Sequence, residues 1–405
     1  MAIRRRAKQT ATRGYTLVET LVTIAVVGTL SSMLLPALQA ARESARMSSC
    51  RHNISQVSKA MLTHESRLGH FPSGGWSPLW LGTADRPSGP GQPGGWAFSL
   101  LPYLGQLDAY DALAGLTPAT AADTYRRAAS VAQPLFACPS RRAARPLPAP
   151  AGGPFMTGAG SVSLTQAARS DYAANGGAVG GCPPLATLRK ITGNVSSNTR
   201  ISISHVPPGN SRNCQSLRLP YNAVVNAHLT ANHPNDRLGS CEGCTGAIDA
   251  TMYTPASLAD GDAWQKATAA QRLALPDQGI PDMQDGVVQR MSRFTAGHLL
   301  DGLSTTYMIG EKFVPAARHE SGTDPGDASV LFAGYSSSTV RWGNQPPLFD
   351  GGLAAAAGAF GSNHRAGWNV ACADGAVRTV AFTIDPAAHK ALASRNDAAL
   401  ITIPW

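Results

Sequence analysis

The sequence predicts an α+β protein that combines a long amino-terminal helix with a larger, loop-rich domain that has strands near its carboxyl end. Three observations support this prediction. An apolar run over residues 15–38 continues into an amphipathic segment over residues 39–66, which is the pattern of one long helix. Glycine (41) and proline (29) are frequent among the 405 residues, which favours turns and loops. Asp374-Gly375 separates two runs of β-forming residues, as in a hairpin.

The predicted helix begins in a segment, residues 15–38, that is apolar over a length sufficient to cross a membrane. Over residues 39–66, apolar side chains recur at spacings of three and four, which places them on one helix face: Met47, Cys50, Ile54, Val57 and Met61. Gly69 and Pro72 then predict a stop, so we expect one helix from about Tyr15 to Ser66. The stripe favours packing against the downstream domain, and a coiled-coil seam is the alternative.

Residues 1–14 form a basic leader that contains five cations and no acidic residue: Arg4, Arg5, Arg6, Lys8 and Arg13. Removal of this leader would lower the formal net charge from +9 to +4, and no cluster of Lys and Arg with interleaved aromatic residues follows it. We interpret the basicity as a topology signal that keeps the amino end in the cytoplasm and directs the remainder outward. Nucleic-acid binding is a minor alternative, and no nucleic-acid partner is expected.

One carboxylate, that of Glu19, lies just inside the apolar run. An ionised carboxylate in hydrocarbon costs roughly 2.5–3.5 kcal/mol, so such a group usually has a partner and a function. Cleavage after Gly14 would supply a partner, because the new amino terminus of Tyr15 would carry an ammonium group nearby. The simpler interpretation is a carboxylate that is tolerated near the membrane interface.

The basic leader, Gly14, the aromatic Tyr15, Glu19 and the apolar helix together resemble the cleavage and methylation signal of type IV pilins and pseudopilins. The resemblance implies that a membrane-embedded aspartic prepilin peptidase cuts between Gly14 and Tyr15 and N-methylates Tyr15. Glu19 would then neutralise the terminal ammonium of its own chain or of a neighbour during assembly. Pro36 stands where pilins commonly carry a helix-kinking proline, whereas Tyr15 replaces the usual Phe.

Three other interpretations of this segment compete with the pilin-like one. A secretory signal cleaved near Ala40 has an apolar core of about 7–15 residues, and the run from Thr16 to Leu38 is longer. A plain signal anchor explains the length but neither Glu19 nor the Gly14–Tyr15 junction. A buried core helix is disfavoured because so long a run has no polar face.

Residues 67–405 are expected to form an extracytoplasmic domain. Trp96–Leu104 is its first apolar block, and helical sequence follows to about Val131. The segment Leu135–Pro139 predicts a short strand that proline ends. Residues 175–290 show no strong periodicity, so we expect a variable, loop-rich insertion with scattered short strands.

The clearest strand signals occur in residues 291–405, where we expect a sheet. The apolar segment Thr306–Ile309 follows the turn sequence Asp301-Gly302. Trp368–Phe382 predicts a hairpin in which Asp374-Gly375 is a two-residue turn with positive φ at both positions. Two cross-strand pairs follow from this turn: Cys372 with Val377, and Val370 with Thr379.

A series of short motifs ends with His364, which precedes Asp374-Gly375 by nine intervening residues. Earlier motifs occur in the order Cys50-x-x-Asn53-x-x-Gln56, Leu101–Leu104, Cys138-Pro139-Ser140, Asp171–Asn175 and Asp301–Thr305. This order resembles a large bacterial family of prepilin-like proteins of unknown function with a carboxyl-terminal H-x9-D-G signature. Ile-Ser stands where that family has Leu-Lys before Gln56. The resemblance implies a pilin-like fold, in which the outer half of the helix packs on an antiparallel sheet, and no established activity.

Seven cysteines in an extracytoplasmic chain favour disulfides or unpaired structural thiols, and the odd number leaves at least one thiol free or paired with another chain. Cys241 and Cys244 have the spacing of half a zinc site, which Cys182 and Cys214 could complete. No second paired motif exists, and an oxidising compartment favours disulfides. Metal binding by these cysteines is therefore the minor alternative.

No cofactor is expected from the sequence, and calcium is left open as a bound ion. The weak candidates are acidic residues in predicted loops, Asp260, Asp262 and Asp374, with a further cluster at Asp282 and Asp285. None of these has the spacing of the twelve-residue calcium loop. For His364, Asp374 and Asp301, a structural role in capping or turns is the favoured interpretation.

No enzyme signature occurs in the sequence: it contains no Gly-x-Ser-x-Gly, His-Glu-x-x-His, phosphate-loop or dinucleotide-binding motif. The leading hypothesis is a non-enzymatic pilin- or pseudopilin-like protein of the inner membrane, with one span and an extracytoplasmic domain. Its expected partners are prepilin peptidase, other pilin-like subunits or itself, and membrane lipid. The alternative is a singly anchored extracytoplasmic binding domain that does not polymerise.

Overall fold

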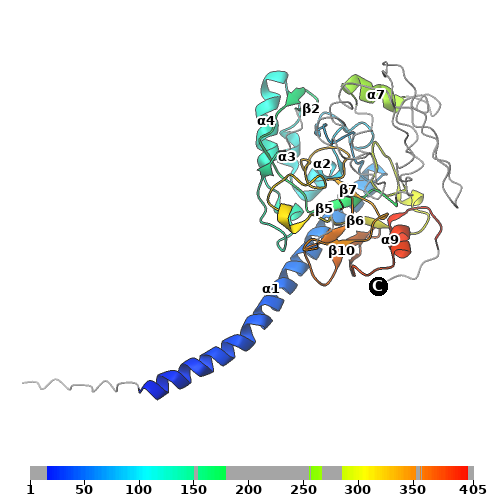
Figure 1. The fold of residues 1–405 in the computed structure, drawn as a ribbon. Coiled ribbons are helices and arrows are strands. Elements are labelled where there is room, and N and C mark those ends of the chain that lie inside the picture. The colour runs from blue at the N-terminus through cyan, green and yellow to red at the C-terminus, as the bar shows by residue number, and fades with distance from the viewer. Residues whose placement is uncertain are drawn as a thin grey trace, which may run out of the picture. The chain divides into compact units, whose positions relative to one another are not determined.

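A computed structural model describes residues 16–149, 154–178, 255, 257–266, 285–352, 356 and 358–399 of the chain. The chain divides into two compact units between Met47 and Ser48. The predicted α+β class is confirmed, because a long amino-terminal helix precedes a domain of short helices, loops and small sheets (Figure 1).

The long helix is α1, Leu17–Leu68, which contains Pro36 and begins and ends within two residues of the predicted bounds. It stops where the sequence indicates, because Gly69 adopts a positive φ of +73° and its amide donates to the Glu65 carbonyl at 2.7 Å. A glycine in the left-handed region is the usual way to satisfy the last carbonyls of a helix.

In the amino-terminal unit, the large apolar side chains of α1 are each at least half exposed: Leu17, Val18, Leu21, Val22, Ile24, Val26, Val27, Leu30, Met33, Leu34, Leu35 and Leu38. Among the described residues, α1 is the one helix with the length and composition to cross a membrane. Exposed apolar area of this extent is costly in water, at about 25 cal/mol per Å². The segment is therefore long and apolar enough to cross a membrane.

The later part of α1 belongs to the second unit and carries the predicted apolar stripe. Cys50, Ile54, Val57 and Met61 are all fully buried, which confirms that this face packs inside the domain. Ile54, Val57 and Met61 share one core cluster with sheet residues such as Ile309. The spacing of three and four residues that predicted the stripe thus corresponds to a single buried helix face.

The central sheet has five strands in the order β11 (Val377–Val380), β10 (Trp368–Cys372), β6 (Tyr307–Glu311), β5 (Tyr172–Asn175) and β7 (Val340–Arg341). The first four strands pair antiparallel, and β7 pairs parallel to β5, so the sheet is mixed at one edge. Alternate residues of β10 belong to different core clusters: Ala371 to the cluster with α1, and Val370 to the cluster with Leu392 of α9 (Pro386–Ala393). Both faces are therefore covered, which explains why β10 is buried throughout.

The hairpin between β10 and β11 differs from its prediction. Val370 pairs with Arg378, and Ala371 pairs with Val377, so both predicted pairings are wrong by one residue. The amide of Gly375 donates to the carbonyl of Cys372 at 2.9 Å, and within Asp374-Gly375 only the glycine has a positive φ, +86°. The connection is thus a turn that a glycine bulge follows, and the bulge adds the residue that shifts the register.

Replacing Gly375 with alanine is expected to lower the free energy of unfolding by about 1–2 kcal/mol, because an L-residue in the left-handed region is strained. Gly375→Asn is the matched control, since asparagine tolerates this conformation, and should lose less. Urea unfolding of both variants measures the difference. An equal loss would instead implicate a close approach to the Leu62 side chain, which lies 2.9 Å from the added Cβ in either variant.

The remaining elements are short: α2 (Trp96–Ser99), η1 (Leu101–Leu104), α3 (Leu107–Asp111), α4 (Pro118–Ser130), η2 (Pro134–Phe136), β1 (Leu147–Pro148), β2 (Phe155–Thr157), β3 (Gly160–Val162), β4 (Gln166–Ala167), α7 (Leu258–Lys266), η6 (Ala296–His298), η7 (Ala316–Arg318), β8 (Leu348–Phe349) and β9 (Gly361–Ser362).

The helical prediction to about Val131 is confirmed by α3 and α4. The strand predicted at Leu135–Pro139 is wrong, because Pro134 starts the 3-10 turn η2 instead. Asp260 and Asp262 lie in helix α7 and not in the predicted loop. Most of the predicted insertion, residues 175–290, lies outside the described residues.

Candidate functional site

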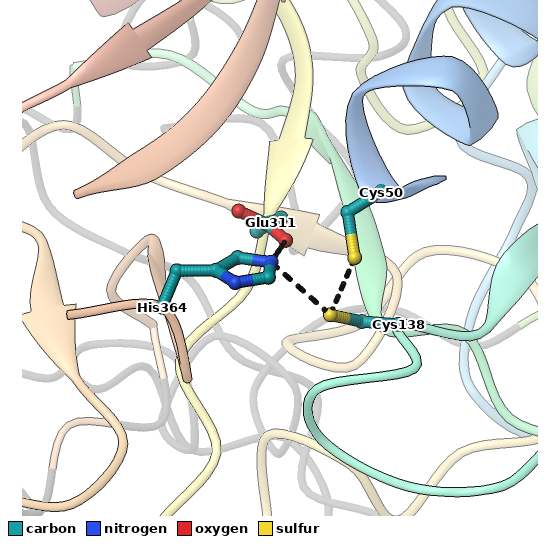
Figure 2. A group of neighbouring side chains, drawn as sticks. All are labelled: Cys50, Cys138, Glu311 and His364. Atoms are coloured by element: carbon teal, nitrogen blue, oxygen red, sulfur yellow. Dashed lines mark hydrogen bonds and ion pairs between the residues drawn. The ribbon is translucent and has the colours of Figure 1, made fainter. Parts of the chain in front are cut away.

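Four side chains from distant parts of the sequence meet in the core of the second unit (Figure 2). This four-residue cluster consists of Cys50 in α1, Cys138 after η2, Glu311 at the end of β6, and His364 after β9. One sulfur, nitrogen or oxygen atom from each residue lies within 4.8 Å of the corresponding atom of every other. Sequence motifs pointed to three of these residues, but not to their meeting.

The contacts inside the four-residue cluster are close. The Cys50 and Cys138 sulfurs are 2.7 Å apart, and Cys138 Sγ lies 3.5 Å from His364 Nε2. His364 Nε2 in turn lies 3.3 Å from Glu311 Oε1. No residue of the cluster has more than 1% of its surface exposed, so it is closed to any substrate in this conformation.

Two polar side chains, those of Asp171 and Asn53, hold the backbone at Cys138. Its backbone amide donates to Asp171 Oδ2 at 2.7 Å, and the preceding carbonyl, that of Ala137, accepts from Asn53 Nδ2 at 3.1 Å. Asn53 lies one helical turn after Cys50, so the same face of α1 supplies one thiol and positions the segment that carries the other. Gln56 makes a longer contact, 3.4 Å, with His52 Nε2 and does not reach the cluster.

Glu311 is oriented by β10. Its Oε2 accepts from the backbone amide of Asn369 at 2.7 Å and from the Asn369 side chain at 3.0 Å. Thr379 on β11 fixes Asn369 in turn, through a 2.7 Å hydrogen bond to Asn369 Oδ1. Oε1 is thereby directed at His364, whose own amide donates to Ser362 Oγ at 3.1 Å.

The electrostatics of the cluster favour a protonated imidazole when no ion is bound. Burial alone would lower the pKa of His364, but its interactions with Cys138 and Glu311 outweigh burial and raise the pKa to about 11. The hydrogen bond from Cys50, together with burial, raises the pKa of the Cys138 thiol well above its ordinary value. A buried thiol that holds its proton is a poor nucleophile, so the Cys138–His364 contact does not resemble an activated catalytic pair.

The donor set suits a metal ion better than it suits catalysis. Two sulfurs, one imidazole nitrogen and one carboxylate oxygen are the ligand types that zinc prefers, and four of them make a closed, tetrahedral site. Glu311 is the member that the sequence analysis missed. The available signal was a carboxylate at the end of an apolar strand, which is rarely buried without a partner.

A buried ionic network adjoins the cluster and consists of three cations and three carboxylates: Arg141, Arg142, Lys312, Asp171, Asp327 and Asp350. Asp171 links the two sites, because one oxygen accepts from the Cys138 amide while the other lies 2.6 Å from Arg142 and 3.2 Å from Arg141. Asp327 lies 2.5 Å from Arg142 and 2.8 Å from Lys312. The side chains of this network are at most 4% exposed, which makes the pairing of each charge essential.

The other carboxylates of the carboxyl-terminal motifs bind backbone amides. Asp374 accepts from the amide of Ala376 at 2.9 Å within the hairpin turn, and it is not part of the four-residue cluster. Asp301 accepts from the amides of Asp397 and Ala398 at 2.8 and 2.9 Å, while Gly302 provides a positive φ of +100°. Both aspartates thus lie where they stabilise turns and chain ends.

Asp260 and Asp262, two further calcium candidates, do not share a site. Asp262 forms an ion pair with Arg86, whereas Asp260 accepts from Ser257 Oγ at 3.0 Å at the start of α7. Pro139 directly follows Cys138 and is exposed. Further candidates lie outside the described residues: Gly14, Tyr15, Cys182, Cys214, Cys241, Cys244 and Asp282.

At its amino end, α1 uses Glu19 as a capping residue. The Glu19 carboxylate accepts from both the amide and the hydroxyl of Thr16 at 2.9 Å, and the Glu19 amide donates back to Thr16 Oγ1 at 3.2 Å. This reciprocal pattern is a capping box. It gives Glu19 a local structural role that the sequence analysis did not consider.

The fold and the cluster define an α+β protein with an apolar amino-terminal helix and a buried set of metal-type ligands. Residues 39–197 and 212–387 match the family described as a protein of unknown function, DUF1559, and the chain belongs to this family. No curated protein and no solved structure matches the chain. Both segments of the match include members of the cluster, since Cys50 and Cys138 lie in the first segment and Glu311 and His364 lie in the second.

Proposed function

We propose that this protein is a non-enzymatic, pilin- or pseudopilin-like subunit of the cell envelope, which prepilin peptidase cleaves after Gly14. The observation that carries the proposal is the division of α1 into an exposed apolar part up to Leu38 and a part from Cys50 onward with one buried face. The first part can lie in lipid or between identical helices, while the second is built into the core of the domain. One continuous helix then joins the assembly segment to the domain that it displays.

The energetics of such an assembly follow from the exposed side chains of α1. In a bilayer, lipid covers the apolar face, and in a bundle the faces of neighbouring helices cover one another. The domain would lie outside the cytoplasmic membrane, because the basic leader holds the amino end inside. Other pilin-like subunits, or copies of the same chain, are the expected partners.

The capping box makes it possible to test the charge of Glu19 separately from its role in helix capping. Because glutamine also serves as the second residue of a capping box, Glu19→Gln keeps the helix start and removes only the charge. We expect the variant to be cleaved normally but to be depleted at least tenfold from sheared filaments or crosslinked oligomers, relative to its membrane pool. Immunoblots of the two fractions give this ratio.

Thr16→Ala is the matched control, because it breaks the same capping box and retains the carboxylate. It should assemble, with a loss of helix stability of about 1 kcal/mol. Normal assembly of Glu19→Gln would contradict the proposed charge pairing. Failure of Thr16→Ala together with normal assembly of Glu19→Gln would show that the cap, and not the charge, limits assembly.

Processing is tested by mass spectrometry of the amino terminus of the native protein. The proposal expects a chain that begins at N-methylated Tyr15. A chain that keeps Met1, or one that begins near Ala41, would remove the basis for assembly through α1. A processed chain that electron microscopy and crosslinking find only as a monomer would instead indicate a singly anchored binding domain.

A further inference from the structure

We propose that the four-residue cluster of Cys50, Cys138, Glu311 and His364 binds one zinc ion, which fastens α1 to the sheet of the extracytoplasmic domain. The inference goes beyond the proposed function, and it depends neither on cleavage after Gly14 nor on assembly. It rests on the convergence of four ligand groups from four separate elements at a site with at most 1% exposure.

The chemistry of the four ligand groups favours zinc over calcium and magnesium. Thiolates and imidazole are ligands for zinc and related borderline metals, whereas calcium and magnesium take oxygen ligands. A single carboxylate oxygen completes the four-coordinate set. With all four positions taken by the protein, the site would be structural and not catalytic, which agrees with its complete burial.

Two of the three close contacts within the cluster have the separations that this coordination requires. Zinc bonds of about 2.0–2.3 Å at tetrahedral angles separate the ligand atoms by roughly 3.3–3.8 Å. Cys138 Sγ and His364 Nε2 are 3.5 Å apart, and His364 Nε2 and Glu311 Oε1 are 3.3 Å apart. The two sulfurs, at 2.7 Å, need to separate by about 1 Å, a displacement within reach of small rotations of the cysteine side chains.

The surroundings orient the ligands as metal sites require. Hydrogen-bonded neighbours usually fix metal-binding side chains, and here Asn369 holds one oxygen of Glu311 so that the other faces the imidazole. Asp171 holds the backbone of Cys138 in the same way. Zinc binds thiolates and neutral imidazole. The two cysteines would therefore each release a proton when the ion binds, and His364 would bind as the neutral imidazole.

A disulfide between Cys50 and Cys138 is the competing structure. It would need the sulfurs to approach to about 2.05 Å. It would use two of the four residues, and the pair of His364 and Glu311 beside it would take no part in that bond. The zinc site accounts for all four, and the two structures differ in mass, metal content and thiol count.

The first measurement uses the full-length chain, purified from membranes in detergent without chelators or reductants. Metal analysis is expected to find at least one zinc per chain, and a non-reducing peptide map is expected to find Cys50 and Cys138 as thiols after denaturation. Added Co²⁺ should replace the ion and give the charge-transfer absorption of cobalt thiolates. A peptide that links Cys50 to Cys138 by a disulfide would overturn the proposal.

The second measurement assigns the ion to this cluster, because cysteines outside the described residues could also bind zinc. His364→Gln and Cys138→Ser are each expected to lose one zinc equivalent relative to the parent chain. Cys372→Ser is the matched control, since this cysteine is equally buried on β10 but is not part of the cluster, and it should keep the full content. An unchanged zinc content in His364→Gln would overturn the assignment.

A third measurement covers the case in which these variants do not fold. Glu311→Gln keeps the size of the side chain and its hydrogen-bond acceptor for Asn369, and it should weaken zinc retention at least tenfold against a competing chelator. Chelation of the wild-type chain should also lower its thermal midpoint by several degrees, and added Zn²⁺ should restore it. Insensitivity of the wild-type midpoint to both treatments, together with absent zinc, would refute the site.

Discussion

Replacing Asp327 with asparagine is expected to lower the free energy of unfolding by about 3–5 kcal/mol, because it leaves buried cations without their counter-charge. Asp327 lies 2.5 Å from Arg142 and 2.8 Å from Lys312, and its side chain has no exposed surface. Burial alone would raise the pKa of Asp327, but the Lys312 ammonium and the Arg142 guanidinium hold the pKa well below its ordinary value. The carboxylate is thus ionised throughout the physiological range.

The matched control is Asp123→Asn, which makes the same chemical change in an ion pair on the surface of α4. Asp123 lies 2.7 Å from Arg126, yet its side chain is 77% exposed. Solvent screens such a pair, so we expect a change within about 0.5 kcal/mol. Urea unfolding of the two variants at pH 7 gives the comparison. Similar losses in both variants would show that the buried network is not the source of the stability.

Acidification from pH 7 to pH 5 is expected to destabilise the fold by about 2 kcal/mol for each of two buried histidines. Burial lowers the pKa of His64 to about 4, and burial also lowers the pKa of His389 to about 4. Each folded-state pKa is thus below the ordinary value of 6.5, so the unfolded chain takes up protons first as the pH falls. The stability is present above pH 6.5 and is lost between pH 6.5 and pH 4.

The environments of these histidines explain the size of the effect. His389 lies among the rings of Tyr307, Phe360 and Trp368, where a charge has little compensation. His64 contacts the carbonyl of His70 at 2.9 Å, yet burial still dominates its pKa. His389→Leu should therefore remove about half of the difference between pH 7 and pH 5.

Urea titrations at the two pH values test this expectation, with His52→Leu on the exposed face of α1 as the control. The control should keep the full difference between pH 7 and pH 5. Other titrating groups, including His364, are common to all three proteins, so they largely cancel in the comparison. A difference that persists unchanged in His389→Leu would show that other groups govern the acid response.

The sequence predicted the features of the fold that depend on neighbouring residues. The spacing of Ile54, Val57 and Met61 predicted a buried helix face, and Gly69 predicted the helix end. Such patterns are local, since the geometry of one helix fixes which residues share a face. The hairpin was placed correctly but its register was not, because Asp374-Gly375 suits both a two-residue turn and a turn with a glycine bulge.

Glu19 has a capping role as well as a charge, and only the charge entered its interpretation from the sequence. Thr16 stands three residues before Glu19, which is the capping-box spacing at the start of an apolar run. The strand predicted at Leu135–Pro139 failed for a similar reason. Pro134 lies just before it and favours the first turn of a 3-10 helix over an extended strand.

What the sequence alone determined is the existence of one long helix. Its first part is apolar all round, and its second part is apolar on one face only. Both features can be identified from the sequence because they depend on the spacing of residues within a single helix. Only the tertiary structure decided that Cys50, Cys138, Glu311 and His364 belong to one site, since they come from four elements and no local pattern relates them. Folding of the chain brings these four side chains together where bulk water does not reach, so their polar atoms must be satisfied by protein groups or by an ion.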